Sequence, residues 1–349
     1  MNELELSEGE KQLLDALLSI ELYPHDEETG KKLTTTPEDI RKRGILIQKY
    51  MFDKKAKLAD WTGMYEGLLT KGLIQYSGSV YALKDEGRPY AFRARSERLG
   101  RRFDNLMIRW DGSTVHSLLC ERVYGKDLCQ AGRVDMHQLE KLLEVLNLTS
   151  ENRVLDMGCG IGKITEFISD LTHAHILGID LASKAIQRAQ ARTEEKRARL
   201  EFREADMNNL SLPPASIDTV IALDTLHYLE NLEKTIGQMK SWLQPHGQMG
   251  LFSFQYSSEN DTPDLLLPSN TDLAQALKKH DLPFQTWDFT ERDKEYSRRL
   301  FQVATELKEE FKAEDNLDLY EDQIGGLEED IQFLDAGKKR RYLYYVRMP

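Results

Sequence analysis

The chain has few cysteines and no long apolar run, and each absence excludes a class of protein. It holds 3 cysteines in 349 residues, and Cys120, Cys129 and Cys159 form neither an even disulfide set nor a metal-binding spacing. No stretch approaches the roughly 18 consecutive apolar residues of a membrane span. The first ten residues are acidic and lack the basic-then-apolar layout of a signal peptide. The sequence therefore predicts a cytoplasmic protein with no membrane association and no bound metal.

Positive charge is also in deficit. The chain holds 47 lysines and arginines against 59 aspartates and glutamates, a formal net charge of −12. Binding to nucleic acid or anionic lipid needs clustered basic residues, so this balance argues against such partners. One basic run is present, at Arg93, Arg95, Arg98, Arg101 and Arg102. We expect it to be a solvent-facing side of a helix that pairs with nearby acids; a docking strip for RNA or protein is the alternative.

The most informative segment reads V-L-D-M-G-C-G-I-G, from Val154 to Gly162. An apolar strand leads into Asp156, and glycines then alternate with other residues ahead of a helical pattern. Glycine lets a backbone turn sharply and approach a ligand without interference from a Cβ atom. The next apolar strand ends in Asp180, and an acid at that place hydrogen-bonds ribose hydroxyls in doubly wound folds. The segment therefore predicts a site for a nucleoside cofactor.

The spacing of the loop distinguishes between two kinds of nucleoside cofactor. A dinucleotide fingerprint, G-x-G-x-x-G, needs a third glycine where Lys163 stands. The carboxylate of Asp156 would repel a pyrophosphate, whereas it would attract a sulfonium and an α-ammonium group. The loop resembles the first motif of class I S-adenosylmethionine-dependent methyltransferases, D-x-G-x-G-x-G, and the resemblance extends over about residues 152–254. Its later motifs lie at residue 180 and at residues 205–207, 218–229 and 243–247.

The resemblance implies S-adenosylmethionine as the cofactor and assigns residues to its parts. Asp156 and the loop amides are expected to hold the methionine portion, Asp180 both ribose hydroxyls, and Leu181 the adenine edge. Asp206 would accept from the adenine amino group while Met207 lies against the ring; a turn-capping carboxylate is the alternative for Asp206. The expected cofactor-binding residues are Asp156, Gly158, Cys159, Gly160, Gly162, Asp180, Leu181, Asp206, Met207 and Leu223.

From residue 152 onward, strand and helix patterns alternate, as a parallel sheet covered on both faces requires. We therefore expect an α/β fold with a doubly wound, Rossmann-like methyltransferase sheet over residues 151–349. The predicted strands are 153–157, 175–180, 200–204, 217–223, 248–254, 284–289 and 341–347. Residues 291–338, before the last strand, carry two helical apolar stripes. In methyltransferases of this class an insertion here commonly covers the acceptor pocket; the alternative is a helical pair that packs on the sheet edge or makes a dimer contact.

Residues 1–92 are expected to form a separate, mainly helical domain, and residues 93–150 a helical linker region. Helical spacing predicts helices at 9–20, 61–69, 98–119 and 135–146, and Thr36-Pro37 is typical of a helix start. Residues 72–83 have the pattern of a short hairpin with a glycine in its turn. Helices followed by such a hairpin resemble the winged-helix domain that several small-molecule O-methyltransferases carry before their catalytic domain. A homodimer formed through this domain is a further expectation.

The acceptor site is expected where the fourth strand ends, because ligands of open α/β sheets bind beyond the carboxyl ends of the strands. His227 is the side chain in that turn whose type has a near-neutral reference pKa. It is therefore the candidate general base, and shaping of the pocket is its alternative role. Tyr124 and Tyr256 are candidates to border the transferred methyl group.

The predicted function is methyl transfer to a small organic acceptor, mainly by proximity and orientation. A general base helps only an acceptor that must lose a proton. One alternative is an RNA or protein methyltransferase that docks through the basic run. A second is a winged-helix transcription regulator that only senses the nucleoside, and it is disfavoured because the candidate recognition helix holds a single lysine, Lys71.

Overall fold

The computed structural model describes residues 4–24, 31–51, 57–258 and 261–348. It divides into two compact units, residues 1–105 and 106–349, and the division falls inside the long helix α4 (Arg88–Gly112). Within the described ranges, no helix is both long and apolar enough to cross a membrane. The acidic N-terminal segment used for the signal-peptide expectation includes residues 1–3, which lie outside the described residues.

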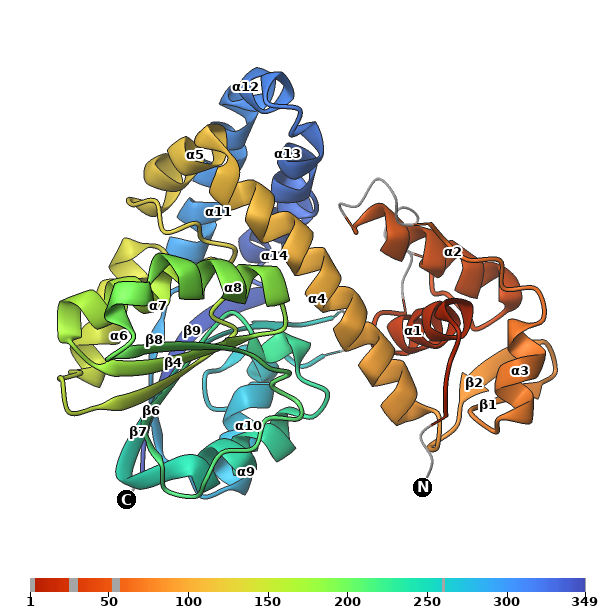
Figure 1. Cartoon of the computed structure of the whole chain (residues 1–349), viewed down its shortest axis with the longest axis horizontal. Helices are drawn as coiled ribbons and strands as arrows, with labels where there is room; N and C mark the ends of the chain where they lie inside the picture. Colours follow the sequence, from red (N-terminus) through yellow and green to blue (C-terminus); the bar gives the residue numbers. More distant parts are fainter. Residues whose placement is uncertain (1–3, 25–30, 52–56, 259–260, 349) are drawn as a thin grey trace. The chain divides into compact units, whose positions relative to one another are not determined.

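The N-terminal unit consists of three helices followed by a hairpin, in the order expected from the sequence (Figure 1). Its elements are α1 (Glu8–Leu22), α2 (Pro37–Lys49), α3 (Met64–Thr70), β1 (Ile74–Ser77), β2 (Val80–Leu83) and the first part of α4. Ser7 caps α1 through reciprocal hydrogen bonds with Glu10, and Thr36 caps α2, as these residue types favour. Helical spacing places four leucines of α1 fully inside the core: Leu13, Leu14, Leu17 and Leu18.

The basic run of α4 makes its contacts within this unit. Arg98 donates to Asp15 of α1, and Arg101 lies 3.3 Å from Glu8 of the same helix. The side chain of Arg102 donates to a backbone carbonyl just after α2. These pairings support the interpretation of the run as a helix face that contacts nearby acids.

The C-terminal unit is a seven-stranded sheet with helices on both faces. Its strands are β3 (Arg153–Met157), β4 (His175–Asp180), β5 (Leu200–Glu204), β6 (Ile217–Leu223), β7 (Leu243–Tyr256), β8 (Phe284–Asp288) and β9 (Lys339–Arg347). Its helices are α5 (Thr114–Tyr124), α6 (Met136–Leu146), α7 (Lys163–Thr172), α8 (Ser183–Arg192), α9 (Leu232–Trp242), α10 (Asp272–Lys279), α11 (Thr290–Glu306), α12 (Lys308–Ala313), α13 (Leu317–Ile324) and α14 (Leu327–Asp335). Single 3-10 turns are η1 (Glu194–Lys196), η2 (Leu226–Tyr228) and η3 (Pro263–Leu266).

The strand order is β5-β4-β3-β6-β7-β9-β8. Strands β3 to β7 are parallel, and β9 runs antiparallel to both β7 and β8. The winding direction reverses between β3 and β6, and doubly wound folds bind ligands at such a switch point. Helices α6, α7 and α8 cover one face, and α9 and α10 cover the other (Figure 1). The expected doubly wound α/β sheet is confirmed.

The strands occupy nearly the predicted ranges, and β7 differs most. It begins at Leu243 rather than at residue 248. Leu243 already pairs with Ile217 of β6, ahead of a register shift in that ladder. The sequence pattern gave no indication of this early pairing.

Two sequence predictions about helices were wrong in detail. Residues 98–119, expected as one helix, belong to α4 and α5, because Ser113 adopts an extended backbone and its hydroxyl caps α5. Residues 291–338, expected to hold two helices, lie in four, α11 to α14. Helix α11 ends before Leu307, while Gly325 and Gly326 separate α13 from α14, with Gly326 left-handed at φ 72°. Apolar spacing continues across both breaks, so the stripes did not reveal them.

Candidate active site

The glycine loop after β3 adopts a backbone that favours glycine. Gly158, Gly160 and Gly162 have φ values of 81°, 56° and 74°. A Cβ atom on Gly158 would lie 2.3 Å from Cγ2 of Thr225, and one on Gly162 would lie 2.5 Å from the ring of Phe202. The loop therefore packs against the turn after β6 and against β5 so closely that no side chain fits.

Asp180, at the end of β4, holds the middle of this loop. Its two carboxylate oxygens accept hydrogen bonds from the backbone N–H groups of Gly160 (2.8 Å) and Ala182 (2.9 Å). An ionised carboxylate has about four lone-pair sites, so these two bonds are compatible with additional donors such as ribose hydroxyls. Asp180 and the adjacent Leu181 are both half-buried. The geometry fits the nucleoside role expected for these two residues.

Asp156, at the end of β3, lies beneath the loop and is 2% exposed. Thr165 of α7 donates its hydroxyl to the carboxylate over 2.6 Å. Burial raises the pKa of Asp156 to about 6, against the lowering effect of the Thr165 hydrogen bond and together with the nearby charge of Asp180. An ionised carboxylate in such surroundings is stabilised by a nearby cation. A sulfonium or an ammonium group above the loop would supply one.

Asp206 follows β5, and its side chain accepts hydrogen bonds within the turn that it begins. Its Oδ1 accepts hydrogen bonds from the backbone and side-chain N–H groups of Asn208, both at 2.9 Å. Met207 packs into the apolar core and is 8% exposed. The turn-capping role considered as the alternative for Asp206 is thus present in the structure, and the adenine contacts of Asp206 and Met207 stay predictions.

Two further residues that were expected to bind the cofactor, Leu223 and Cys159, lie in the same part of the domain. Leu223, the last residue of β6, is half-buried. Burial raises the pKa of the Cys159 thiol well above its ordinary value, which keeps the sulfur protonated and unreactive. Cys159 therefore fills space in the loop and is no candidate nucleophile.

The C-terminal end of α4 lies against the glycine loop. A Cβ atom on Gly160 would be 3.1 Å from Cε of Met107. Asp111 of α4 pairs with Lys163 of α7 (2.8 Å) and with Arg188 of α8 (2.7 Å). The lysine that breaks the dinucleotide fingerprint therefore ties α4 to the helix behind the loop. The sequence analysis missed Met107 and Asp111, because nothing in the local pattern of α4 marks a contact with a distant loop.

His227 lies in η2, directly after β6, and its side chain is exposed. Its ring centroid is 4.0 Å from that of Tyr228 and 5.2 Å from that of Phe254. The Phe254 ring in turn lies 5.4 Å from the ring of Tyr256. A row of aromatic rings thus connects two of the acceptor-site candidates, His227 and Tyr256.

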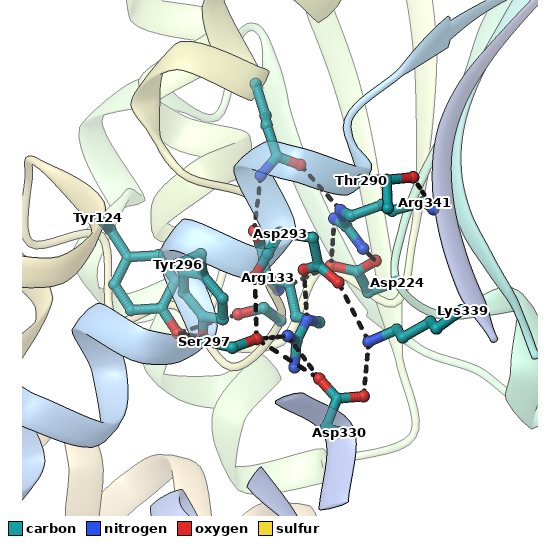
Figure 2. A network of polar contacts seen from close by, with 12 residues as sticks. Tyr124, Arg133, Asp224, Thr290, Asp293, Tyr296, Ser297, Asp330, Lys339 and Arg341 are labelled. Carbon is teal, nitrogen blue, oxygen red and sulfur yellow. Dashed lines mark hydrogen bonds and ion pairs between the residues drawn. The ribbon is translucent and has the colours of Figure 1, made fainter. Parts of the chain in front are cut away.

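Six charged side chains form a network (Figure 2). It lies beside the rings of Phe254 and Tyr256, because Lys339 is 5.3 Å from both ring centroids. We call it the charged network; its members are Arg133, Asp224, Asp293, Asp330, Lys339 and Arg341. Arg341 of β9 forms a bidentate pair with Asp224, at 2.5 and 3.0 Å, and neither side chain is more than 6% exposed. Asp224 directly follows β6 in a left-handed conformation (φ 58°). This pair fixes the turn that leads to His227.

The other four members form a second group. Arg133 lies 2.6 Å from Asp293 and 2.8 Å from Asp330. Lys339 lies 3.1 Å from Asp293 and 2.7 Å from Asp330. Burial alone would raise the pKa of Asp293, but the neighbouring cations, Arg133 first, lower it to about 2. Each cation is thus shared between a carboxylate of α11 and a carboxylate of α14.

The two candidate tyrosines contact this region from different elements. The hydroxyl of Tyr124, at the end of α5, donates to the carbonyl of Gly132 (2.9 Å) and lies 2.8 Å from the hydroxyl of Tyr296. The hydroxyl of Tyr256 donates to Oδ1 of Asp330 over 2.8 Å. Burial raises the pKa of both Tyr124 and Tyr256 well above the ordinary value. Both hydroxyls are therefore neutral at physiological pH and suit hydrogen-bond donation better than proton abstraction.

Residues 154–247 match a family model described as Methyltransferase domain. The chain carries a class I S-adenosylmethionine-dependent methyltransferase domain. The match includes the glycine loop, Asp180 and Asp206, the segments on which the resemblance was based. In the described part of this chain, no cluster of three or more histidine, cysteine, aspartate or glutamate side chains is arranged to hold a metal ion.

Curated relatives of the methyltransferase domain are similar over part of their length. Phosphoethanolamine N-methyltransferase 3 of Arabidopsis thaliana is 24% identical over 254 residues, 70% of this chain and 51% of that protein. The 27-O-demethylrifamycin SV methyltransferase of Amycolatopsis mediterranei (strain S699) is 32% identical over 117 residues, 33% of this chain and 43% of that protein. The chain thus spans about half the length, or less, of these relatives.

Solved structures share the fold of the domain. Phosphoethanolamine N-methyltransferase 2 of Haemonchus contortus, in complex with S-adenosyl-L-methionine, has a TM-score of 0.58 and 18% identity, with 71% of this chain and 60% of that chain covered. The [4+2]-cyclase SpnF has a TM-score of 0.56 and 17% identity, with 73% of this chain and 96% of that chain covered. At these identities the likeness concerns the fold alone.

The sequence motifs marked the segments that the family model matches, whereas no motif marked the charged network. Its members come from elements far apart in the sequence, so no local motif contains them. One signal was available. Asp293 and Ser297 share helical spacing with Tyr296 and Leu300 on α11, and all four are buried. Polar residues within an apolar helical stripe indicate a buried polar contact.

Proposed function

We propose that this chain transfers the methyl group of S-adenosylmethionine to a small organic acceptor. The observation that supports this most is the glycine loop, with three left-handed glycines and a backbone N–H bonded to Asp180. S-adenosylmethionine, when bound, supplies an activated methyl group on a neutral leaving group. Asp156 and the loop amides would hold its methionine portion, and Asp180 its ribose. Leu181, Asp206 and Met207 would surround the adenine, and Leu223 would contact the cofactor from the end of β6.

The contribution of the protein is then mainly to bring the acceptor into line with the methyl group. The turn after β6 suits this task, since the Arg341–Asp224 pair holds it in place. Among the acceptor-site candidates, His227 is the best base for a hydroxyl acceptor, because the raised pKa values of Tyr124 and Tyr256 suit them to donation. The tyrosines would border the methyl group or orient the acceptor.

Two observations favour a small acceptor. The relatives named above act, by their names, on phosphoethanolamine and on demethylrifamycin, which are small molecules. In addition, α11 and α14 both contact β9 at the edge where the parallel strands end, so we propose that residues 291–338 act as a lid on the acceptor. RNA or protein as acceptor is less favoured, since Arg98, Arg101 and Arg102 of the basic run already have partners.

The experiment measures binding and transfer separately, because the fold is shared with a protein named as a cyclase. Calorimetry on the full chain should show micromolar binding of S-adenosylmethionine and S-adenosylhomocysteine, and negligible binding of nicotinamide dinucleotides. Mass spectrometry of a panel of small amines, acids and alcohols incubated with the chain and S-adenosylmethionine should then detect a product 14 mass units heavier. Tight binding without any methylated product would favour a function other than methyl transfer.

The N-terminal unit and the location of the protein are further parts of this proposal. We propose that the three helices and hairpin form a winged-helix-like domain, that two chains associate through it, and that the protein works in the cytoplasm. The antiparallel pairing of β1 with β2 after three helices supports the first point. Sedimentation analysis of the full chain, and of a variant with Tyr76→Glu at the exposed face of the hairpin, would test the second. A monomer at all concentrations would contradict it.

A further inference from the structure

Three hydrogen-bond donors converge on one carboxylate at the carboxyl edge of the sheet. Oδ1 of Asp330 accepts from Nζ of Lys339 (2.7 Å) and from the hydroxyl of Tyr256 (2.8 Å). Oδ2 lies 2.8 Å from Nη2 of Arg133. The Ser297 hydroxyl is 3.4 Å from Oδ2, but it donates its one proton to the carbonyl of Asp293 at 2.9 Å. The donors come from β9, β7 and the loop before α6. Both oxygens of this single carboxylate are thus coordinated as a bound anion would be.

Asp330 differs from the other acids of the charged network in place and exposure. It lies on α14, within the inserted residues 291–338, and its side chain is 11% exposed (Figure 2). Asp293 is completely buried, and Asp224 is 6% exposed and paired with Arg341. Tyr256, one of the donors, is 41% exposed. The Asp330 site, which includes Arg133 (19% exposed), therefore opens towards solvent on one side, whereas Asp293 and the Arg341–Asp224 pair are closed off.

The charges of the network determine what could replace Asp330. Arg133, Lys339 and Arg341 supply three positive charges, and Asp224, Asp293 and Asp330 supply three negative ones. Without Asp330 the network carries one uncompensated positive charge. A single carboxylate restores the balance, whereas a phosphate monoester, with a charge of about −1.5 to −2 at pH 7, exceeds it.

We propose that the three donors around Asp330 are the binding site for a carboxylate of the methyl acceptor, and that Asp330 occupies this site in the ligand-free chain. This inference rests on the proposed methyl transfer. Lys339 lies 5.3 Å from the ring centroids of both Phe254 and Tyr256, and Phe254 lies 5.2 Å from His227. An acceptor anchored at Lys339 would therefore extend along the Phe254 ring towards the turn after β6. Displacement of Asp330 would require α14 to move, which couples acceptor binding to the insertion.

The anion site is tested by asking whether a free carboxylate replaces the missing one. In Asp330→Ala the three donors remain and the carboxylate is gone. Acetate should raise the melting temperature of this variant in a saturable manner, by about 2–4 °C. Sodium chloride and sodium phosphate at the same ionic strength should not raise the melting temperature of this variant. The matched control is Asp335→Ala, which also removes a carboxylate that joins α14 to α11, through Lys294 (2.9 Å) and Arg298 (2.7 Å), but at the surface. The control should respond to acetate as it does to chloride.

Each other outcome overturns the inference or part of it. Equal effects of acetate and chloride on Asp330→Ala would remove the anion site. A response to phosphate in place of acetate would contradict the choice of a carboxylate, and an acetate response in the Asp335→Ala control would show a non-specific effect. If Asp330→Ala does not fold in buffer, it is refolded from urea in acetate and in chloride. Recovery in acetate alone supports the site, and recovery in neither overturns it.

A second experiment tests binding of the acceptor itself. Because Asp330 competes for the site, Asp330→Asn should lower the apparent KM for a carboxylate-bearing acceptor by about tenfold or more. The KM for the corresponding amide should not fall, and an equal fall for both would contradict the inference. Binding of S-adenosylhomocysteine, measured by calorimetry, should be unchanged in both variants. An acetate response in a chain that does not bind S-adenosylhomocysteine would leave the anion site standing and overturn the proposed methyl transfer.

Discussion

Asp180 combines two tasks in one carboxylate, because it holds the glycine loop and is expected to bind the cofactor ribose. We expect Asp180→Ala to weaken S-adenosylmethionine binding by about 1.5–3 kcal/mol, the range for hydrogen bonds to a charged group. Calorimetry measures this directly. The matched control is Asp218→Ala, which removes a carboxylate that accepts a backbone hydrogen bond from Arg153 (2.7 Å) at the opposite end of the sheet. Unchanged affinity in Asp180→Ala would exclude the ribose role.

His227 is the residue on which a proton-transfer step depends, if the acceptor is a hydroxyl. His227→Gln should then lower turnover by roughly 10² to 10⁴ while cofactor affinity stays the same. The control is His175→Gln, an exposed residue at the start of β4. This substitution should leave turnover unchanged. With an acceptor that needs no deprotonation, the His227 substitution should change mainly KM.

At the scale of elements, the sequence predicted what depends on local patterns. The strands β3 to β6 were predicted to within a residue because alternating strand and helix patterns and the glycine loop mark their ends. The breaks at Ser113, Leu307 and Gly325-Gly326 were missed, since apolar spacing continued through them. The charged network was missed for a different reason. Its pairs join residues up to about 200 positions apart, and only the folded sheet brings them together.

The separation of α13 from α14 depends on the left-handed conformation of Gly326. Gly326→Ala should therefore lower the free energy of unfolding by about 1 kcal/mol. A residue with a side chain is strained at φ 72°, even though no atom lies within 4 Å of the place that the new Cβ atom would take. Gly112→Ala, at the end of α4 and equally free of neighbours, is the control, and it should be neutral or stabilising by up to about 1 kcal/mol. Urea unfolding of both variants provides the comparison. Equal effects would show that the backbone at Gly326 is not strained.

The insertion as a whole is predicted to serve the acceptor and not the cofactor. Replacing residues 291–338 with a short turn removes Asp293 and Asp330 together with the helices that carry them, so Arg133 and Lys339 become accessible to water. This variant should bind S-adenosylhomocysteine nearly normally and show no turnover. Loss of cofactor binding in a folded variant would assign a structural role to the insertion.

At the scale of the whole molecule, Asp156 links stability to pH. Its pKa is about 6 in the folded chain and 3.8 ordinarily, which corresponds to about 3 kcal/mol. A group with a raised pKa in the folded state favours folding below about pH 4, and that contribution is lost as the pH rises through 6. Asp156→Asn should therefore become more stable relative to the unmodified chain as the pH rises from 4 to 6. Urea unfolding across this range tests the sign, and a difference that is independent of pH would contradict the burial of an ionisable Asp156.

The position of β9 between β7 and β8 has a consequence for the order of folding during synthesis. The strands β3 to β7 pair only with one another among the strands translated up to that point. This part of the sheet can therefore assemble while the chain is still growing. Strand β8 pairs with β9 alone, and β9 is the last of the sheet's seven strands to be translated. Until residues 339–347 emerge, β7 presents an open edge, which invites association between nascent chains. Within the charged network, Asp293 and Asp330 can pair with Arg133 as soon as they are translated. Their contacts with Lys339, and the pairing of Asp224 with Arg341, wait for β9.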